Sequence, residues 1–120
     1  MFKFLSRQRE QKGDPALTSA LRDLSSENYT VRTEAVEKLK KQGTPLATES
    51  VMTALQSPNA NVRQCAAIVL LHIGNHRAVG SLCSVAVHDP ERFVREPAVM
   101  ALARLKDRRS METLLSVARP

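Results

Sequence analysis

The chain has 120 residues, only three Phe and one Tyr, no Trp, and a formal net charge of +6 at pH 7. Plentiful Ala, Leu, Arg and Glu, with only 4 Gly, favour an all-α protein over a sheet-rich one. No apolar run reaches about 18 residues, so the sequence predicts no membrane-spanning helix.

Charge and cysteine usage bear on partners and location. Residues 1–12 carry a net charge of +3 and residues 61–120 carry +4, which favours encounters with anionic partners without identifying one. Two widely separated cysteines, Cys65 and Cys83, occur in a chain whose first residues lack the features of a secretory signal. We therefore expect reduced thiols and a cytoplasmic protein.

The first 13 residues are expected to form a degenerate or frayed first helix. Residues 13–15 (Gly-Asp-Pro) match residues 43–45 (Gly-Thr-Pro), which places a weakened copy of the repeat described below in front of them. Arg9 stands where later copies carry Leu, and a polar outer face is typical of a terminal repeat. A short amphipathic membrane anchor is the alternative for this segment.

Three copies of one pattern dominate the rest of the chain. Each begins with Val-Arg and carries an Ala four residues after the Val and a Leu eight residues after it, which marks one face of a helix. The Val residues are 31 and 32 residues apart, a period that indicates a stacked helical array. The copies are Val31-Arg32-Ala35-Leu39, Val62-Arg63-Ala66-Leu70 and Val94-Arg95-Ala98-Leu102.

A second amphipathic helix is expected beside each copy. Asp14, Thr44 and Asn75 are suited to cap its first turn, and Pro15 and Pro45 suit its first position. Each unit is therefore expected to be a helical hairpin whose first helix carries Val-Arg.

Particular residues predict how the Val-Arg helices start and end. Gly43 and Gly74 are suited to end the first two in a left-handed conformation, but Lys106 stands at the third place, so that turn is expected to differ. Pro97 predicts a kink or a late start in the third helix. The pair Asp89-Pro90 predicts a cap followed by a first helical residue.

The combination of Val-Arg-x-x-Ala-x-x-x-Leu, a Gly and a second amphipathic helix resembles the HEAT repeat. It is most similar to the short HEAT-like repeats first noted in phycobilin lyase subunits. The best match is Val62–Asp89, and the resemblance covers residues 14–120, which we treat as one HEAT-like repeat domain. It implies a right-handed α-α superhelix of about four helical hairpins, in which Arg32, Arg63 and Arg95 brace neighbouring repeats.

No grouping of side chains supports catalysis, so we expect a protein that is not an enzyme and takes no cofactor. His72 and His76 are four residues apart, a metal-ligand spacing on a helix, but Gly74 between them should break that helix. The scattered Gly residues form no phosphate-binding loop, and the scarcity of aromatic residues argues against base stacking.

We expect a non-catalytic protein–protein interaction scaffold or adaptor that presents the second helices of its hairpins as a concave surface. A nucleic-acid-binding module that uses the basic C-terminal half is the second hypothesis. An accessory subunit of a lyase-like complex, implied by the resemblance alone, is the third. The candidate binding residues form a basic turn, Arg104, Lys106, Arg108 and Arg109, and the candidates on the second helices are Glu49, Met52, Ser84 and Glu112.

The last predicted helix, Ser110–Ala118, carries Leu114, Leu115 and Val117 without a polar capping repeat after them. An uncovered apolar end of an array tends to associate with another surface. We therefore expect a homodimer through this helix, a different protein partner, or a following repeat.

Overall fold

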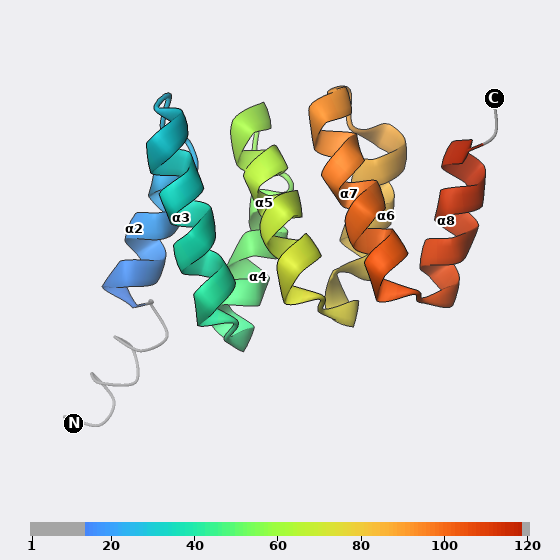
Figure 1. Cartoon of the computed structure of the whole chain (residues 1–120), viewed down its shortest axis with the longest axis horizontal. Coiled ribbons are helices and arrows are strands. Elements are labelled where there is room, and N and C mark those ends of the chain that lie inside the picture. Colours follow the sequence, from blue (N-terminus) through green and yellow to red (C-terminus); the bar gives the residue numbers. More distant parts are fainter. Residues whose placement is uncertain (1–13, 119–120) are drawn as a thin grey trace.

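A computed structural model describes residues 14–118, which are all-helical and contain no strand (Figure 1). The predicted first helix in residues 1–13 lies outside the described residues. None of the described helices has the length and apolar composition that a bilayer crossing requires. The elements are α2 (Pro15–Asp23), α3 (Tyr29–Gln42), α4 (Pro45–Ala54), α5 (Ala60–Ile73), the 3₁₀ turn η1 (His76–Ala78), α6 (Val79–His88), α7 (Arg92–Leu105) and α8 (Arg108–Ala118).

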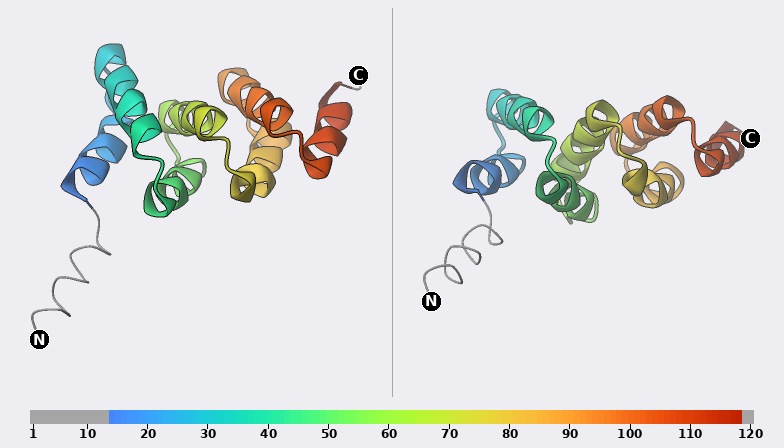
Figure 2. Two further views of the ribbon diagram at one scale, coloured as in Figure 1. Left: turned by 60° about the horizontal axis from the view of Figure 1, so that its bottom comes forward. Right: turned by 90° about the horizontal axis from the view of Figure 1, so that it is seen from below.

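The helices form two layers of a solenoid (Figures 1 and 2). The three 14-residue helices that carry Val-Arg, α3, α5 and α7, lie side by side in one layer, and α5 packs against both of the others. The shorter helices α2, α4 and α6 form the second layer, and α8 packs against α6. The predicted all-α, HEAT-like solenoid is confirmed.

The pairing of helices within a unit differs from the prediction. Each Val-Arg helix packs against the short helix that precedes it, which gives the pairs α2–α3, α4–α5 and α6–α7. The two-residue connections after α3 and α5 carry the chain to the other layer and on to the next unit, so α3 makes little contact with α4. The Val-Arg helix is therefore the second helix of its unit, and α8 begins a further unit.

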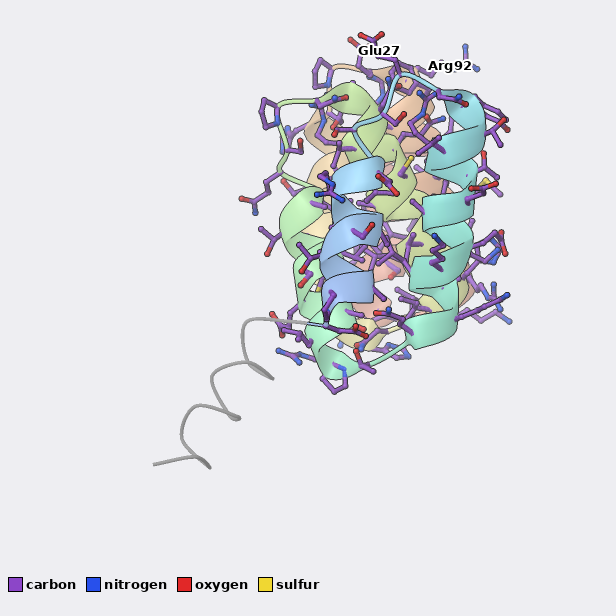
Figure 3. All side chains as sticks on the ribbon, turned by 90° about the vertical axis from the view of Figure 1, so that its left-hand side faces the viewer. Glu27 and Arg92 are labelled. Atoms are coloured by element: carbon purple, nitrogen blue, oxygen red, sulfur yellow. The ribbon has the colours of Figure 1, made fainter. Side chains whose placement is uncertain are left out.

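The turns within these pairs recur along one edge of the stack. Figure 3 views the stack from the α2–α3 end. Glu27, in the turn before α3, and Arg92, the first residue of α7, appear at the same edge. The buried core consists of Leu, Val and Ala side chains and Cys65, and every described α-helix except α8 contributes to it. Repetition of one unit therefore places equivalent turns in a row.

Side-chain caps fix the start of most helices. The predicted caps Asp14 and Thr44 accept hydrogen bonds from the Ala16 and Ala47 N–H groups, and Asn75 caps η1 in the same way. The prediction for Asp89-Pro90 is wrong, because α7 begins at Arg92 and the carboxylate of Asp89 has another partner.

Two further predictions concern α7, and the structure contradicts the late start and the different turn. The helix does not start late, because Arg92 occupies the same place relative to Val-Arg as the first residues of α3 and α5, and Pro97 is accommodated inside the helix. The turn after α7 does not differ either. Lys106 adopts φ 53°, close to the φ of 50° at Gly43 and 66° at Gly74, so a lysine takes the left-handed conformation that glycine takes in the other units.

A lysine in this conformation brings its Cβ close to the backbone, a cost that glycine does not have. We expect Lys106→Gly to raise the free energy of unfolding by about 1 kcal/mol, measured by urea denaturation. Lys106→Ala removes the charge but keeps the Cβ and is expected to give no such gain. Equal stability of the Gly and Ala variants would contradict this account.

Candidate interaction surface

The three Val-Arg arginines share one local contact. Each donates a hydrogen bond from Nη1 to the backbone carbonyl six residues earlier, in the turn before its own helix, which fixes the guanidinium at the edge of the stack. The distances are 2.7 Å from Arg32 to Ser26, 2.9 Å from Arg63 to Ser57 and 2.7 Å from Arg95 to Asp89.

Only Arg63 also reaches the neighbouring unit. Its Nε lies 2.8 Å from Oδ2 of Asp89 and its Nη2 lies 3.3 Å from Oδ1, in a two-pronged ion pair. The side chains of Arg63 and Asp89 are 13% and 5% exposed. Asp89 also accepts a hydrogen bond from the Glu91 N–H, so its carboxylate both shapes the turn before α7 and joins it to α5.

Arg32 and Arg95 lack this second contact. Ser57 stands where Asp89 stands in the next unit, and its hydroxyl accepts the equivalent backbone hydrogen bond, from Asn59 N–H, but offers no charge. The Arg32 guanidinium lies 5.8 Å from the centre of the Tyr29 ring. Among residues 14–118, Arg95 makes no ion pair. The bracing role implied for all three arginines is therefore filled by Arg63.

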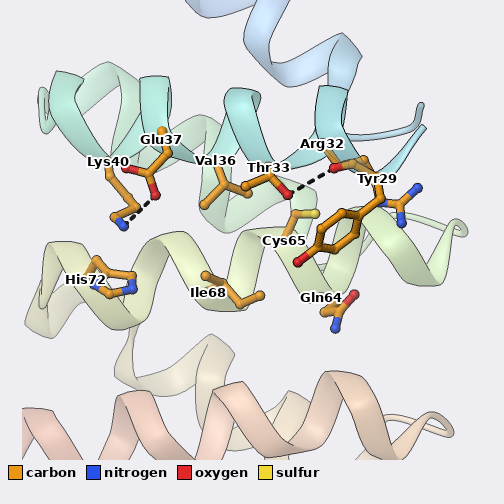
Figure 4. A pocket seen from close by; sticks show the side chains of 10 residues that line it. All are labelled: Tyr29, Arg32, Thr33, Val36, Glu37, Lys40, Gln64, Cys65, Ile68 and His72. Carbon is orange, nitrogen blue, oxygen red and sulfur yellow. Dashed lines mark hydrogen bonds and ion pairs between the residues drawn. The ribbon is translucent and has the colours of Figure 1, made fainter. Parts of the chain in front are cut away.

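A groove opens between α3 and α5 (Figure 4). Tyr29, 73% exposed, lies at one end, and the Glu37–Lys40 ion pair of 2.9 Å lies towards the other end. Lys40 lowers the pKa of the Glu37 carboxyl through a hydrogen bond and its charge. Cys65 is buried in the groove, and burial raises the pKa of its thiol. The other lining residues are Arg32, Thr33, Val36, Gln64, Ile68 and His72.

A second groove, which we call the α7–α8 slot, has a more apolar lining. Val99 and Met100 of α7 form one wall and Val117 of α8 contributes to the other. Arg95 lies at the slot, and the exposed pair of Arg92 and Glu96, 2.9 Å apart, lies beside it. Ala86 of α6 completes the lining of the slot.

The basic turn predicted as a binding site is partly occupied by internal contacts. Arg104 reaches back to the Leu71 carbonyl at 3.3 Å, and Arg108 lies 3.9 Å from Glu112. Lys106 is exposed at the left-handed position. Arg104 and Arg108 therefore contact different parts of the chain.

Asp107 organises the remaining part of this turn. Its carboxylate lies 3.6 Å from Arg109 and 3.7 Å from His76, and the Arg109 N–H hydrogen bond is the main cause of a lowered pKa for Asp107. As predicted, Gly74 ends the helix between His72 and His76, which therefore lie on separate elements.

The candidate residues of the predicted concave surface lie on the short helices. Glu49, Ser84 and Glu112 are exposed and Met52 is half-buried, but all four belong to α4, α6 and α8. Packing between neighbouring helices is most extensive between α5 and α7, in the layer of the Val-Arg helices. The groove between α3 and α5 also lies on this layer, on a mixed polar stripe that hydrophobic periodicity does not detect.

Comparison with known proteins supports this architecture. The family model for HEAT repeats matches residues 14–103, which run from the cap of α2 almost to the end of α7 and so cover the three packed helix pairs. No curated protein matches the chain.

Because Arg63 and Asp89 are both largely buried, we expect loss of one charge to leave the other poorly compensated. Asp89→Asn keeps an acceptor for the Glu91 N–H and should lower the free energy of unfolding by about 3 kcal/mol. The matched change Glu96→Gln breaks an exposed pair and should cost less than about 0.5 kcal/mol. Urea denaturation measures both, and similar small losses would show that the buried pair contributes little.

Proposed function

Because the chain belongs to the HEAT repeat family, we propose that it is a non-catalytic scaffold or adaptor that binds a protein partner. The layer of α3, α5 and α7 is the proposed binding face. The stack supports this proposal because it presents a continuous row of helices with a groove between α3 and α5. We also propose a cytoplasmic location, on the basis of the free thiols of Cys65 and Cys83.

The observation that carries the proposal is the exposure of large apolar side chains near both grooves. Tyr29 is 73% exposed at the α3–α5 groove and Met100 is 57% exposed at the α7–α8 slot. Aromatic residues, Met and Arg are enriched in protein interfaces, and Arg32 and Arg95 stand beside these two side chains. This composition suits a protein surface better than a phosphate backbone.

Nucleic-acid binding is the alternative, based on the net charge of +4 in residues 61–120. The internal partners of Arg108 and Arg109 reduce the support for it. The role of an accessory subunit in a lyase-like complex rests on the sequence resemblance alone, and no described residue favours it.

Capture of partners from a cell lysate tests the proposal. The chain should retain a discrete protein after nuclease treatment and in high salt, because apolar contacts depend little on ionic strength. Tyr29→Ala should reduce the captured amount several-fold. Leu46→Ala, on α4 in the opposite layer and 40% exposed, is the matched control and should have no effect. Recovery of nucleic acid alone, lost at high salt, would replace the scaffold by the nucleic-acid-binding alternative.

A further inference from the structure

Helix α8 corresponds in position and in apolar pattern to α6, a short helix that a Val-Arg helix covers. It occupies the place in its unit that α6 occupies one unit earlier, where α7 packs against α6. The α6 residues Val79 and Leu82 are fully buried. The equivalent residues of α8, 32 positions later, are less buried: Met111 is 53% exposed and Leu114 is half-buried. Among residues 14–118, no second helix covers this face of α8 as α7 covers α6.

Helix α7 shows the same incomplete burial on its side of the α7–α8 slot. In α5, Ala67 is fully buried against its neighbours in the stack. The equivalent residue of α7, Val99, is only half-buried, and the following Met100 is 57% exposed. The apolar walls of the slot therefore match the two surfaces that receive a Val-Arg helix elsewhere in this chain.

The contacts of the Val-Arg arginines give a second, independent indication of what binds in the slot. Arg63 and Arg95 make the same Nη1 hydrogen bond to the turn before their helices. Arg63 uses its Nε and Nη2 for the carboxylate of Asp89, which precedes the next helix of its layer by three residues. Among the described residues, no carboxylate lies within ion-pair distance of Arg95. A planar guanidinium edge is suited to a two-pronged carboxylate.

We propose that the α7–α8 slot binds an amphipathic helix of a partner protein, and that an Asp or Glu in the turn before this helix pairs with Arg95. The inference rests on the proposed scaffold function and specifies the chemistry of its partner. The helix covers Met100 and Val117 with its apolar face, and its acidic turn lies at the edge of the stack, where Asp89 lies in the preceding unit.

The probe is a peptide with the sequence of α7 and the acidic turn before it. We choose it because α7 packs in the equivalent position one unit earlier, against α5 and α6. Residues 88–105, acetylated, amidated and fluorescently labelled, are titrated with the full chain in an anisotropy assay. We expect saturable binding that is weakened about tenfold by Asp89→Asn in the peptide, because a charge-assisted pair is lost.

Variants of the full chain assign the contact. Arg95→Gln should weaken the Asp89 peptide about tenfold and abolish the difference between the two peptides. Met100→Asp should abolish binding of both. Arg108→Gln, which removes an equal charge from a side chain that is 94% exposed on α8, should leave binding unchanged.

Several outcomes would overturn the inference. The first is that the chain, shown to be folded by circular dichroism, does not bind the peptide. The second is that the Arg95→Gln chain still binds the Asp89 peptide more tightly than the Asp89→Asn peptide, by the same factor as the unchanged chain. The third is that the Met100→Asp chain binds both peptides as tightly as the unchanged chain. Sedimentation showing a dimer that Met100→Asp dissociates and the peptide disrupts would replace the partner helix by a second copy. Failure of the peptide while lysate capture remains sensitive to Tyr29→Ala would remove the slot and leave the scaffold function standing.

Discussion

A helix of 9 to 14 residues cannot bury its own apolar stripe, and the layered stacking of this chain follows from that constraint. Each short helix is covered by the Val-Arg helix that follows it, and each pair is covered by the next pair. The same constraint operates at α7 and α8, where side chains equivalent to buried residues are exposed. The α7–α8 slot that we propose as a binding site therefore consists of residues equivalent to core residues of the preceding units, at a position where no described helix covers them.

One carboxylate distinguishes the two joints between Val-Arg helices. Where Asp89 binds Arg63, α5 and α7 pack extensively. Where Ser57 replaces the carboxylate, Arg32 lies near the ring of Tyr29, α3 and α5 pack less extensively, and a groove lies between them. A change of one side chain in a turn is thus associated with the difference between a closed joint and an open surface.

The sequence was informative wherever the determinants are local. Helical periodicity and the caps Asp14, Thr44 and Asn75 predicted the helices, because each cap acts within three residues of itself. The predicted pairing of helices was wrong because a Val-Arg helix is joined by a short turn to the helix before it and by another to the helix after it. Either turn could join a helical hairpin, and only the packing of the helices decides between the two pairings. Lys106 was misjudged because the surrounding stack imposes a left-handed turn on a residue that does not prefer it. The role of Asp89 depends on Arg63, which is 26 residues away in the sequence. An interpretation from neighbouring residues alone therefore predicts only a helix cap for Asp89.

The unequal joints also give the stack unequal stiffness along its length. Bending concentrates where neighbouring helices share the fewest contacts, so the joint between α3 and α5 is more compliant than the joint between α5 and α7. A ligand that bound the groove at this joint and favoured one width of it would couple its affinity to the curvature of the array. By thermodynamic reciprocity, tension or compression applied along the array changes the strength with which the ligand is held.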